Sequence, residues 1–160
     1  MSLAIRPATP DDATLIVSLI GELAEYEKLA HECHATVEGI EHWLFGRAQK
    51  AYCLIMEWEG KVAGFVLYFY NFSTFLAKPG LYVEDLFVRP AFRRRGIARQ
   101  VFAHLAKKAL EEGCGRVEWW VLNWNEDALN FYRTLGAVSM DEWTVQRITG
   151  PALETLAATA

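Results

Sequence analysis

The first third of the chain alternates apolar and polar residues in segments of strand and helix length. Residues 3–6 predict a short strand. A helix is expected over residues 10–26, because Thr9 can cap it, acids occupy its first turn, and apolar residues recur at helical spacing. A second helix is expected over residues 36–46.

The middle of the chain is typical of antiparallel strands. Residues 51–58 and 61–70 are rich in β-branched and aromatic side chains, and the pair Glu59-Gly60 between them favours a tight hairpin. A polar break over residues 71–80 precedes a third long strand at 81–88.

Helices and strands alternate in the remainder. A helix is expected over 96–112, a strand over 116–122 and a helix over 126–135. Residues 138–148 predict one or two further strands, and residues 151–160 carry only weak signals. Because a helix separates the strands before and after residues 96–112, those strands should be parallel. The order predicts a mixed α/β fold with a mostly antiparallel sheet and helices on both faces.

Length and composition indicate one globular domain. The 160 residues are 52% hydrophobic, enough for a sizeable core. The longest apolar run, residues 62–70, is half the roughly 20 residues that a membrane helix needs. Residues 1–6 lack the basic and apolar blocks of a secretion signal. We therefore expect a single cytoplasmic domain over residues 1–160, with 150–160 as its C-terminal tail, and no membrane partner.

Charge and cysteine usage exclude two classes of function. The net charge of −4 argues against a nucleic-acid partner, which needs a basic surface. Cys33, Cys53 and Cys114 form no CxxC pair or Cys/His cluster, so we expect neither a disulfide framework nor a metal site. They fit small apolar side chains that stay reduced.

The segment 84–99 carries the clearest chemical signal, since a strand runs into a loop that opens a helix. Five basic residues fall between 89 and 99, where free main-chain amides at a helix start favour an anion. Gly96 and Ala98 would let a pyrophosphate approach the main chain. A solvated basic turn has the same composition, so this loop alone leaves both interpretations open.

Several ordered motifs extend this signal. Residues 93–98 read Arg-Arg-Arg-Gly-Ile-Ala and match the pattern (Arg/Gln)-x-x-Gly-x-(Gly/Ala), with matching segments at 5–9, 22–27, 83–88 and 124–132. On these residues the chain resembles the GCN5-related N-acetyltransferase (GNAT) superfamily, most closely the diamine (spermidine/spermine-type) N-acetyltransferases and their bacterial relatives. The resemblance implies the GNAT fold, acetyl-CoA as acetyl donor, and no metal.

The resemblance also implies where acetyl-CoA lies. Main-chain groups of Leu86, Phe87 and Val88 would bind the pantetheine arm like an added strand, while their side chains serve the core. The loop that follows would hold the pyrophosphate, and the start of the helix at 126 would line the cofactor. The residues implied in these two stretches are Arg93, Arg94, Arg95, Gly96, Ile97, Ala98 and Arg99, and Asn125, Glu126, Asp127 and Ala128.

Amine acetylation requires two proton transfers. An alkyl ammonium has a pKa near 10.4 and must lose a proton before it attacks a thioester, and the thiolate must then be protonated. By resemblance Glu84 is the base, acting through water, and Tyr132 is the acid, since a phenol pKa near 10 suits a leaving alkyl thiolate. Glu84 and Asp85 should point to opposite faces unless a bulge re-aims one. The alternatives are an ion pair of Glu84 with a nearby arginine and a packing role for Tyr132.

The acceptor side is expected to be acidic and aromatic, which suits a second cationic amine. By resemblance, and by their charge or aromatic character, the substrate residues would be Tyr26, Glu27, Glu84, Asp85, Glu118, Trp119, Trp120 and Asp141 or Glu142. The loop 71–76 lacks the acid–aromatic pair of the polyamine enzymes, and two residues are missing around 139–142. These departures leave room for a shorter diamine, a lysine-like amino acid such as thialysine, or another small primary amine.

The sequence therefore predicts direct transfer of acetyl from acetyl-CoA to a primary amine of a small di-/polyamine or lysine-like molecule. The resemblance further implies a homodimer. Two alternatives stay open at this point: acetylation of a protein N-terminus or lysine, and a non-catalytic acyl-CoA sensor.

Overall fold

The computed structural model describes residues 2–160 of the chain. They divide into two compact units, Met1–Leu122 and Asn123–Ala160, and each is described by itself. The larger unit holds the sheet with its flanking helices, and the smaller one holds two short helices. The single domain over 1–160 stays a prediction.

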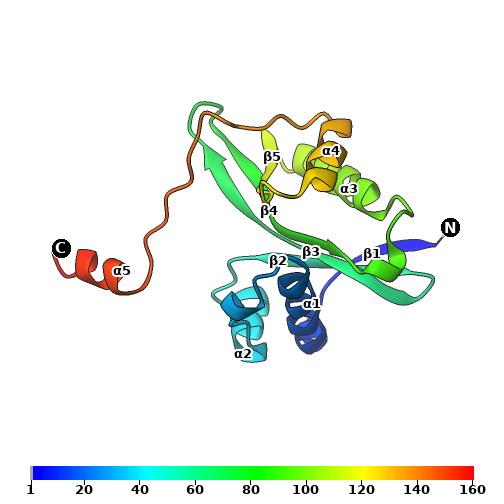
Figure 1. The fold of residues 1–160 in the computed structure, drawn as a ribbon, viewed down its shortest axis with the longest axis horizontal. Helices are drawn as coiled ribbons and strands as arrows, with labels where there is room; N and C mark the ends of the chain where they lie inside the picture. The colour runs from blue at the N-terminus through cyan, green and yellow to red at the C-terminus, as the bar shows by residue number, and fades with distance from the viewer. Residues whose placement is uncertain (1) are drawn as a thin grey trace. The chain divides into compact units, whose positions relative to one another are not determined.

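A five-stranded sheet in the order β1-β2-β3-β4-β5 forms the centre of the larger unit (Figure 1). The first four strands pair antiparallel, and β5 pairs parallel to β4, as the intervening helix predicts. The strands are β1 (Leu3–Pro7), β2 (Tyr52–Trp58), β3 (Lys61–Ser73), β4 (Lys78–Val88) and β5 (Arg116–Trp119).

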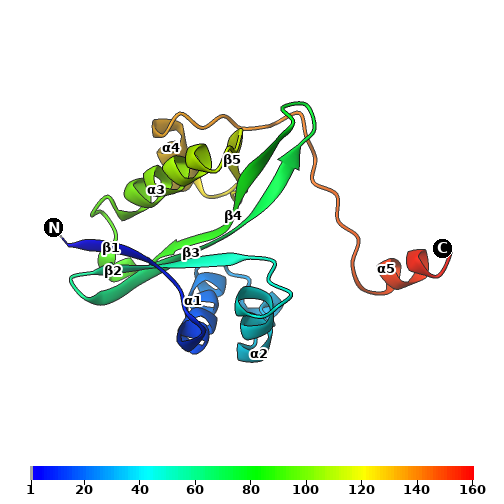
Figure 2. The same cartoon turned by 180° about the vertical axis from the view of Figure 1, so that it is seen from behind.

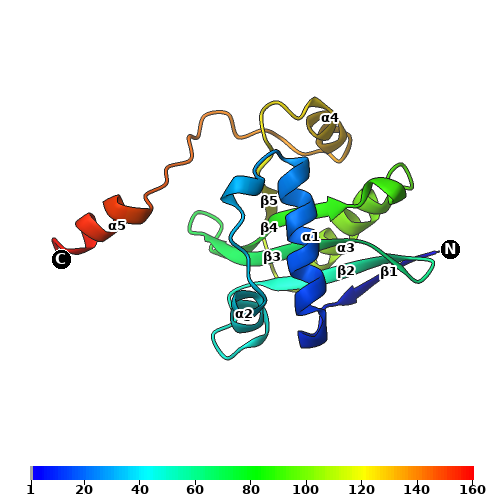
Figure 3. The same ribbon diagram turned by 60° about the horizontal axis from the view of Figure 1, so that its bottom comes forward.

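Helices cover both faces of this sheet, as expected. Figures 1 and 2 show α1 and α2 on one face and α3 on the other, and Figure 3 shows α2 beside α1. The helices are α1 (Ala13–Tyr26), α2 (Val37–Ile40) and α3 (Ile97–Glu111). Short helical turns extend them: 3₁₀ turns at Pro10–Asp12, Ala30–Glu32 and Pro90–Phe92, and a π turn at Glu41–Phe45.

The start of α1 is held by the signals read from the sequence. Thr9 donates its main-chain N–H to the carboxylate of Asp12 at 2.8 Å, which completes a capping box. Asp12 also receives two hydrogen bonds from the Arg6 guanidinium, at 2.8 and 3.1 Å. This pairing holds the pKa of Asp12 below its ordinary value. The helix is therefore anchored directly to β1.

The core on the α1 face joins α1 to β2, β3 and β4. Apolar side chains at helical spacing on α1 meet side chains at alternate positions of the strands. These buried residues are Ile16, Leu19, Leu23, Leu44, Cys53, Ile55, Phe65, Leu67 and Phe87. On the opposite face, α3 buries Val101, Phe102, Leu105 and Ala109. The sheet thus lies between two apolar layers.

Two glycines allow tight main-chain geometry in the sheet. Glu59 and Gly60 both have positive φ, 50° and 80°, which is the geometry of a two-residue hairpin turn and confirms the predicted hairpin. At Gly64 a Cβ atom would lie 2.0 Å from the carbonyl oxygen of Phe87. No side chain fits there, so β3 and β4 approach closely beside the site described below.

Two sequence predictions about strands were wrong. The polar break at 71–80 is much shorter, because Asn71–Ser73 pair with Lys78–Gly80 and extend the β3–β4 hairpin. Residues 138–148 form no strand in the described chain, although they alternate apolar side chains. A strand needs a partner for its main-chain groups, and the local pattern does not supply one.

The smaller unit contains α4 (Glu126–Thr134) and α5 (Gly150–Ala157). The first was predicted, and its N-cap Asn125 accepts a hydrogen bond from the amide of Ala128 at 3.2 Å. The second lies in the predicted tail, where Pro151 at the first turn and a run of helix-forming residues favour it.

Candidate active site

The sheet opens where β4 and β5 part. β5 pairs only with Gly80–Val83, whereas β4 continues to Val88. Within residues 2–160 no strand covers the β5 side of residues 84–88, so main-chain groups there lack a ladder partner. An extended chain of amides can add to such an edge as another strand would.

A β-bulge lies at the same place. Leu67 pairs with Asp85 and Tyr68 pairs with Val83, so Glu84 is the extra residue of β4. A bulge of this kind re-aims side chains, so Glu84 and Asp85 need not alternate strictly between the two faces. This is the condition under which the two adjacent carboxylates can serve one site.

Three carboxylates gather around this bulge. Burial, then repulsion by Glu84 and Glu27, raises the pKa of Asp85 from 3.8 to about 7. Burial and the charge of Glu84 likewise raise the pKa of Glu27, which caps the end of α1. These mutual effects require the three groups to lie near one another. The structure thus brings together Glu27, Glu84 and Asp85, which we name the carboxylate group.

The carboxylate group has no cation of its own. In the described part of the chain, none of its three members takes part in an ion pair. The arginine at the end of β4, Arg89, binds Glu22 instead, at 2.9 Å. The alternative in which Glu84 forms a strand-end ion pair with a nearby arginine is therefore not what the structure shows.

Sequence reasoning missed Tyr82. Its pKa is raised above the ordinary value of 10, first by burial and then by the charges of Glu84, Glu118 and Asp85. The edge of its ring meets Trp120, with ring centres 6.1 Å apart. The sequence could have indicated Tyr82, because it lies two positions before Glu84 in one strand and side chains at that spacing point to the same face.

The predicted substrate residues of β5 and the turn after it divide between two faces. Glu118 is held by Arg116 at 3.1 Å, and Trp120 lies beside Tyr82. Trp119 packs on Phe102 of α3, with ring centres 4.6 Å apart. Glu118 and Trp120 therefore lie toward Tyr82, whereas Trp119 belongs to the α3 layer.

The start of α3 is suited to an anion. Gly96 caps it in the left-handed conformation, with φ of 74°, and Arg94 before it has φ of 62°. No side chain caps the helix, and its first turn holds no acid. The amides of residues 97–99 precede the first intrahelical donor, Gln100, and therefore point out of the helix. Main-chain donors and the positive end of the helix dipole coincide there.

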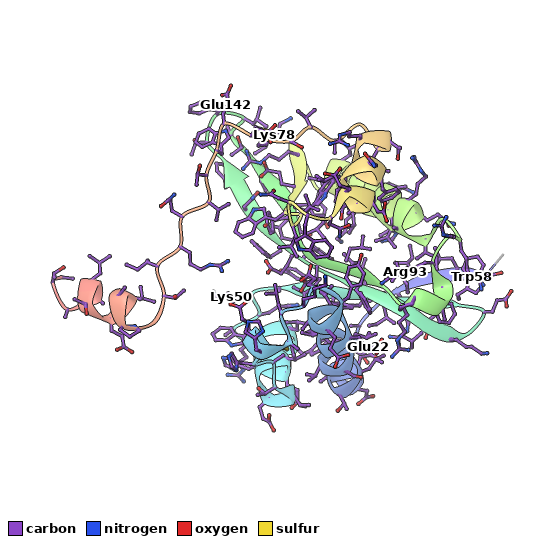
Figure 4. The ribbon with its side chains drawn as sticks, in the orientation of Figure 1. Glu22, Lys50, Trp58, Lys78, Arg93 and Glu142 are labelled. Atoms are coloured by element: carbon purple, nitrogen blue, oxygen red, sulfur yellow. The ribbon has the colours of Figure 1, made fainter. Side chains whose placement is uncertain are left out.

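Two arginines of the predicted pyrophosphate loop lie against aromatic rings of other elements. The Arg93 guanidinium lies 4.6 Å from the centre of the Tyr26 ring, and its Nε donates to the Val88 carbonyl at 3.0 Å. Arg95 lies 5.4 Å from the ring of Trp58. Figure 4 labels Arg93 and Trp58 in this region. Side chains of this loop thus reach both α1 and the β2–β3 hairpin.

The smaller unit holds the other predicted site residues. The side-chain oxygen of Asn125 caps α4, and Glu126 and Asp127 stand in the first turn, where the helix dipole favours acids. Tyr132 lies on the same helix beside Phe131, with ring centres 5.7 Å apart. Asp141 and Glu142 are exposed in the segment that follows. Tyr132 and Glu84 therefore belong to different compact units.

Residues 2–160 contain no group of three His, Cys, Asp or Glu side chains arranged to hold a metal ion. None of the described helices combines the length and apolar character needed to cross a bilayer.

Comparison with known proteins places the chain in a family. The model of the Acetyltransferase (GNAT) family matches residues 18–137. An L-ornithine N5-acetyltransferase of Arabidopsis thaliana is 34% identical, covering 95% of this chain and 86% of its own length. A thialysine N-epsilon-acetyltransferase of Bos taurus is 35% identical, with 96% of both chains covered.

A solved structure gives the same result for the fold. An integron cassette protein from the mobile metagenome of V. cholerae superimposes with a TM-score of 0.82 at 27% identity, over 98% of both chains. With a family model spanning most of the sequence and amine acetyltransferases matched along nearly its full length, the chain belongs to the GNAT acetyltransferases and is an enzyme that acetylates amines.

Proposed function

We propose that this enzyme transfers acetyl from acetyl-CoA directly to a primary amine of a small di-/polyamine or lysine-like molecule. The observation that carries the acceptor class is the carboxylate group, Glu27, Glu84 and Asp85, which holds no cation of its own. A molecule with two amines can place one at the reaction centre and leave the other as a compensating cation. Relatives named for ornithine and thialysine support this class.

The donor half of the proposal relies on two features of the larger unit. Main-chain groups of Leu86, Phe87 and Val88 at the open edge of β4 suit the amides of a pantetheine arm. Amides at the start of α3 suit a diphosphate. We assign the loop 93–99 and residues 125–128 to the cofactor, in keeping with the family, whose members use acetyl-CoA.

In the proposed mechanism the neutral amine attacks the thioester carbonyl, and the carbon–sulfur bond breaks. Glu84, directly or through one water, accepts the proton that the amine loses. Tyr132 donates a proton to the departing thiolate, which leaves as the CoA thiol. Asp85, with a pKa of about 7, and Glu27 balance the charge of the acceptor. The remaining residues that we assign to the acceptor side are Tyr26, Glu118, Trp120 and Asp141 or Glu142. Trp119 is left out, because its ring packs on Phe102 in the α3 layer.

Thiol release from acetyl-CoA, measured against a panel of amines, tests this function. The panel contains putrescine, spermidine, spermine, ornithine, lysine, thialysine and a small peptide. Turnover should be greatest with an acceptor that carries a second amine. A monoamine of equal length should have a higher KM than the matching diamine. Greater turnover with the peptide would instead favour protein acetylation, and no binding of acetyl-CoA by calorimetry would reject the donor.

We further propose a homodimer. Large apolar side chains are exposed throughout the last part of the chain: Val138, Met140, Trp143, Val145, Ile148, Leu153 and Leu156. Such a concentration of exposed apolar residues is typical of an interface. Light scattering at micromolar concentration should report twice the chain mass of 18.2 kDa, and a particle of the chain mass would reject the dimer.

We also assign the enzyme to the cytoplasm, a compartment that suits its three unpaired cysteines.

A further inference from the structure

Two arginines in the connection between β4 and α3 reach across to α1. Arg89, the residue after β4, binds the carboxylate of Glu22 through Nε at 3.1 Å and Nη2 at 2.9 Å. Its Nη1 donates to the Val62 carbonyl of β3 at 3.2 Å. A two-pronged arginine–carboxylate pair fixes orientation as well as distance. Arg89 therefore ties α1 to the sheet in one defined position.

Arg93 makes the second connection, four residues further along. Its guanidinium lies 4.6 Å from the ring centre of Tyr26 and 5.9 Å from that of Phe87. Its Nε is fixed by the Val88 carbonyl at 3.0 Å. A guanidinium over an aromatic ring is attractive, and the hydrogen bond to β4 holds it there. Tyr26 is thereby joined to the strand whose edge faces the proposed cofactor.

The two contacts are matched in spacing. Glu22 and Tyr26 lie one turn apart on α1 and share a face, and Arg89 and Arg93 flank the 3₁₀ turn Pro90–Phe92. Figure 4 labels Glu22 on α1 and Arg93 on the loop. The C-terminal part of α1 is thus held at two points, one turn apart, by a connection that leads into the start of α3.

The two segments that these arginines join, the β4–α3 connection and the end of α1, lie next to the two proposed binding sites. The connection runs into the α3 amides that we assign to the diphosphate, and α1 ends at Tyr26, next to Glu27 of the carboxylate group. The contacts of Arg89 with Glu22 and of Arg93 with Tyr26 are the direct links between the two. The Arg93 guanidinium, as it stands, is engaged by Tyr26 and not by the α3 start.

We propose that Arg89 and Arg93 are positioning residues that couple the cofactor site to the amine site. This inference rests on the proposed function. Binding of CoA orders the β4–α3 connection, the two arginines transmit this order to α1, and Tyr26 and Glu27 are held ready for the amine. Coupling between two sites is reciprocal, so amine binding also raises the affinity for CoA.

Hydrogen exchange with CoA as the probe tests the coupling without turnover. The amides of Glu27, Lys28 and Leu29 are hydrogen-bonded at the end of α1, so their protection can be measured. In the wild-type enzyme CoA should slow exchange in the loop 93–99 and also in residues 23–29. In Arg89→Lys, which keeps the charge but loses the two-pronged pair, protection should remain in the loop and fall at the end of α1.

Kinetics supply a second readout that a general loss of structure would not reproduce. In Arg89→Lys and in Glu22→Gln the KM for the amine at saturating acetyl-CoA should rise about five-fold, while the Kd of CoA for the amine-free enzyme changes by less than about two-fold. The double variant should be no worse than either single one. The swap Glu22→Arg with Arg89→Glu should restore part of the amine affinity. Lys107→Gln, on the exposed surface of α3, is the matched control for removal of a charge.

The outcomes are distinguishable. Protection by CoA that stays in the loop and never reaches residues 23–29 overturns the coupling and leaves the proposed function standing. Additive effects of the two single variants, or a rise confined to the KM for acetyl-CoA, overturn it as well. If the wild-type enzyme does not bind CoA, the coupling and the proposed donor fall together.

Discussion

Replacement of Asp85 by asparagine should make the protein more stable at neutral and alkaline pH. Asp85 lies at the β-bulge beside Glu84, and in residues 2–160 no side chain or main-chain group donates a hydrogen bond to its carboxylate. Burial first, and then the charges of Glu84 and Glu27, raise its pKa from 3.8 to about 7. Asparagine has nearly the same shape and removes the charge.

The size of the effect follows from this pKa. One pH unit between folded and unfolded pKa values corresponds to about 1.4 kcal/mol, so the interval from 3.8 to about 7 corresponds to about 4 kcal/mol. Because the folded pKa is the higher one, this contribution to stability is fully present below pH 3.8 and is lost as the pH rises through about 7. Above that pH, wild-type protein carries the whole cost and the asparagine variant carries none.

Denaturant unfolding at a series of pH values from about 4.5 to 8.5 measures this difference, at one fixed protein concentration because of the proposed dimer. The free energy of unfolding of Asp85→Asn minus that of wild type should rise across the window and level off above pH 8. Asp141→Asn, the same exchange at an exposed position, is the matched control for the exchange itself.

A constant difference between Asp85→Asn and wild type across this window would refute the reasoning. It would mean that the carboxyl of Asp85 titrates alike in the folded and unfolded chain. Acetylation of a diamine by the same variant should fall while its stability rises. Groups that are held at a cost to stability are typical of functional sites, where they serve the reaction.

Three further results are expected. Gly64→Ala should lower the free energy of unfolding by about 2 kcal/mol or more, because the new Cβ would lie 2.0 Å from the Phe87 carbonyl oxygen. Gly21→Ala, with open space around it, should not, and equal denaturant midpoints for the two variants would contradict this account. Glu84→Gln should make kcat/KM depend more steeply on high pH, since only free-base amine then reacts; an unchanged pH profile speaks against a base at this position. Tyr132→Phe should lower kcat by about 10²-fold, and a near-normal rate would show that another group is the acid.

Local signals in the sequence were sufficient for much of the fold. The Glu59-Gly60 pair specified its hairpin because both positions accept left-handed geometry, and Thr9 with Asp12 specified the start of α1. The motif at 93–98, with its companions along the chain, was enough for the family. Each of these depends on residues that are close in sequence, or on a pattern of residue types that needs no coordinates.

Contacts between segments that are distant in the sequence could be identified only from the tertiary structure. The bulge at Glu84 is a matter of register between β3 and β4, and the elevated pKa of Asp85 depends on burial and on Glu27, 58 positions away. The direction of Arg93, toward Tyr26, depends on where α1 lies.

Residues 138–148 show that a local pattern can also predict an element that does not form. Their alternating apolar pattern predicts a strand, but a strand also requires a partner with free hydrogen-bonding groups. Sequence alone therefore determined the local conformations and the family. Only the packing of the chain decided which side chains meet, because pairing energies and burial belong to residue pairs far apart in the sequence.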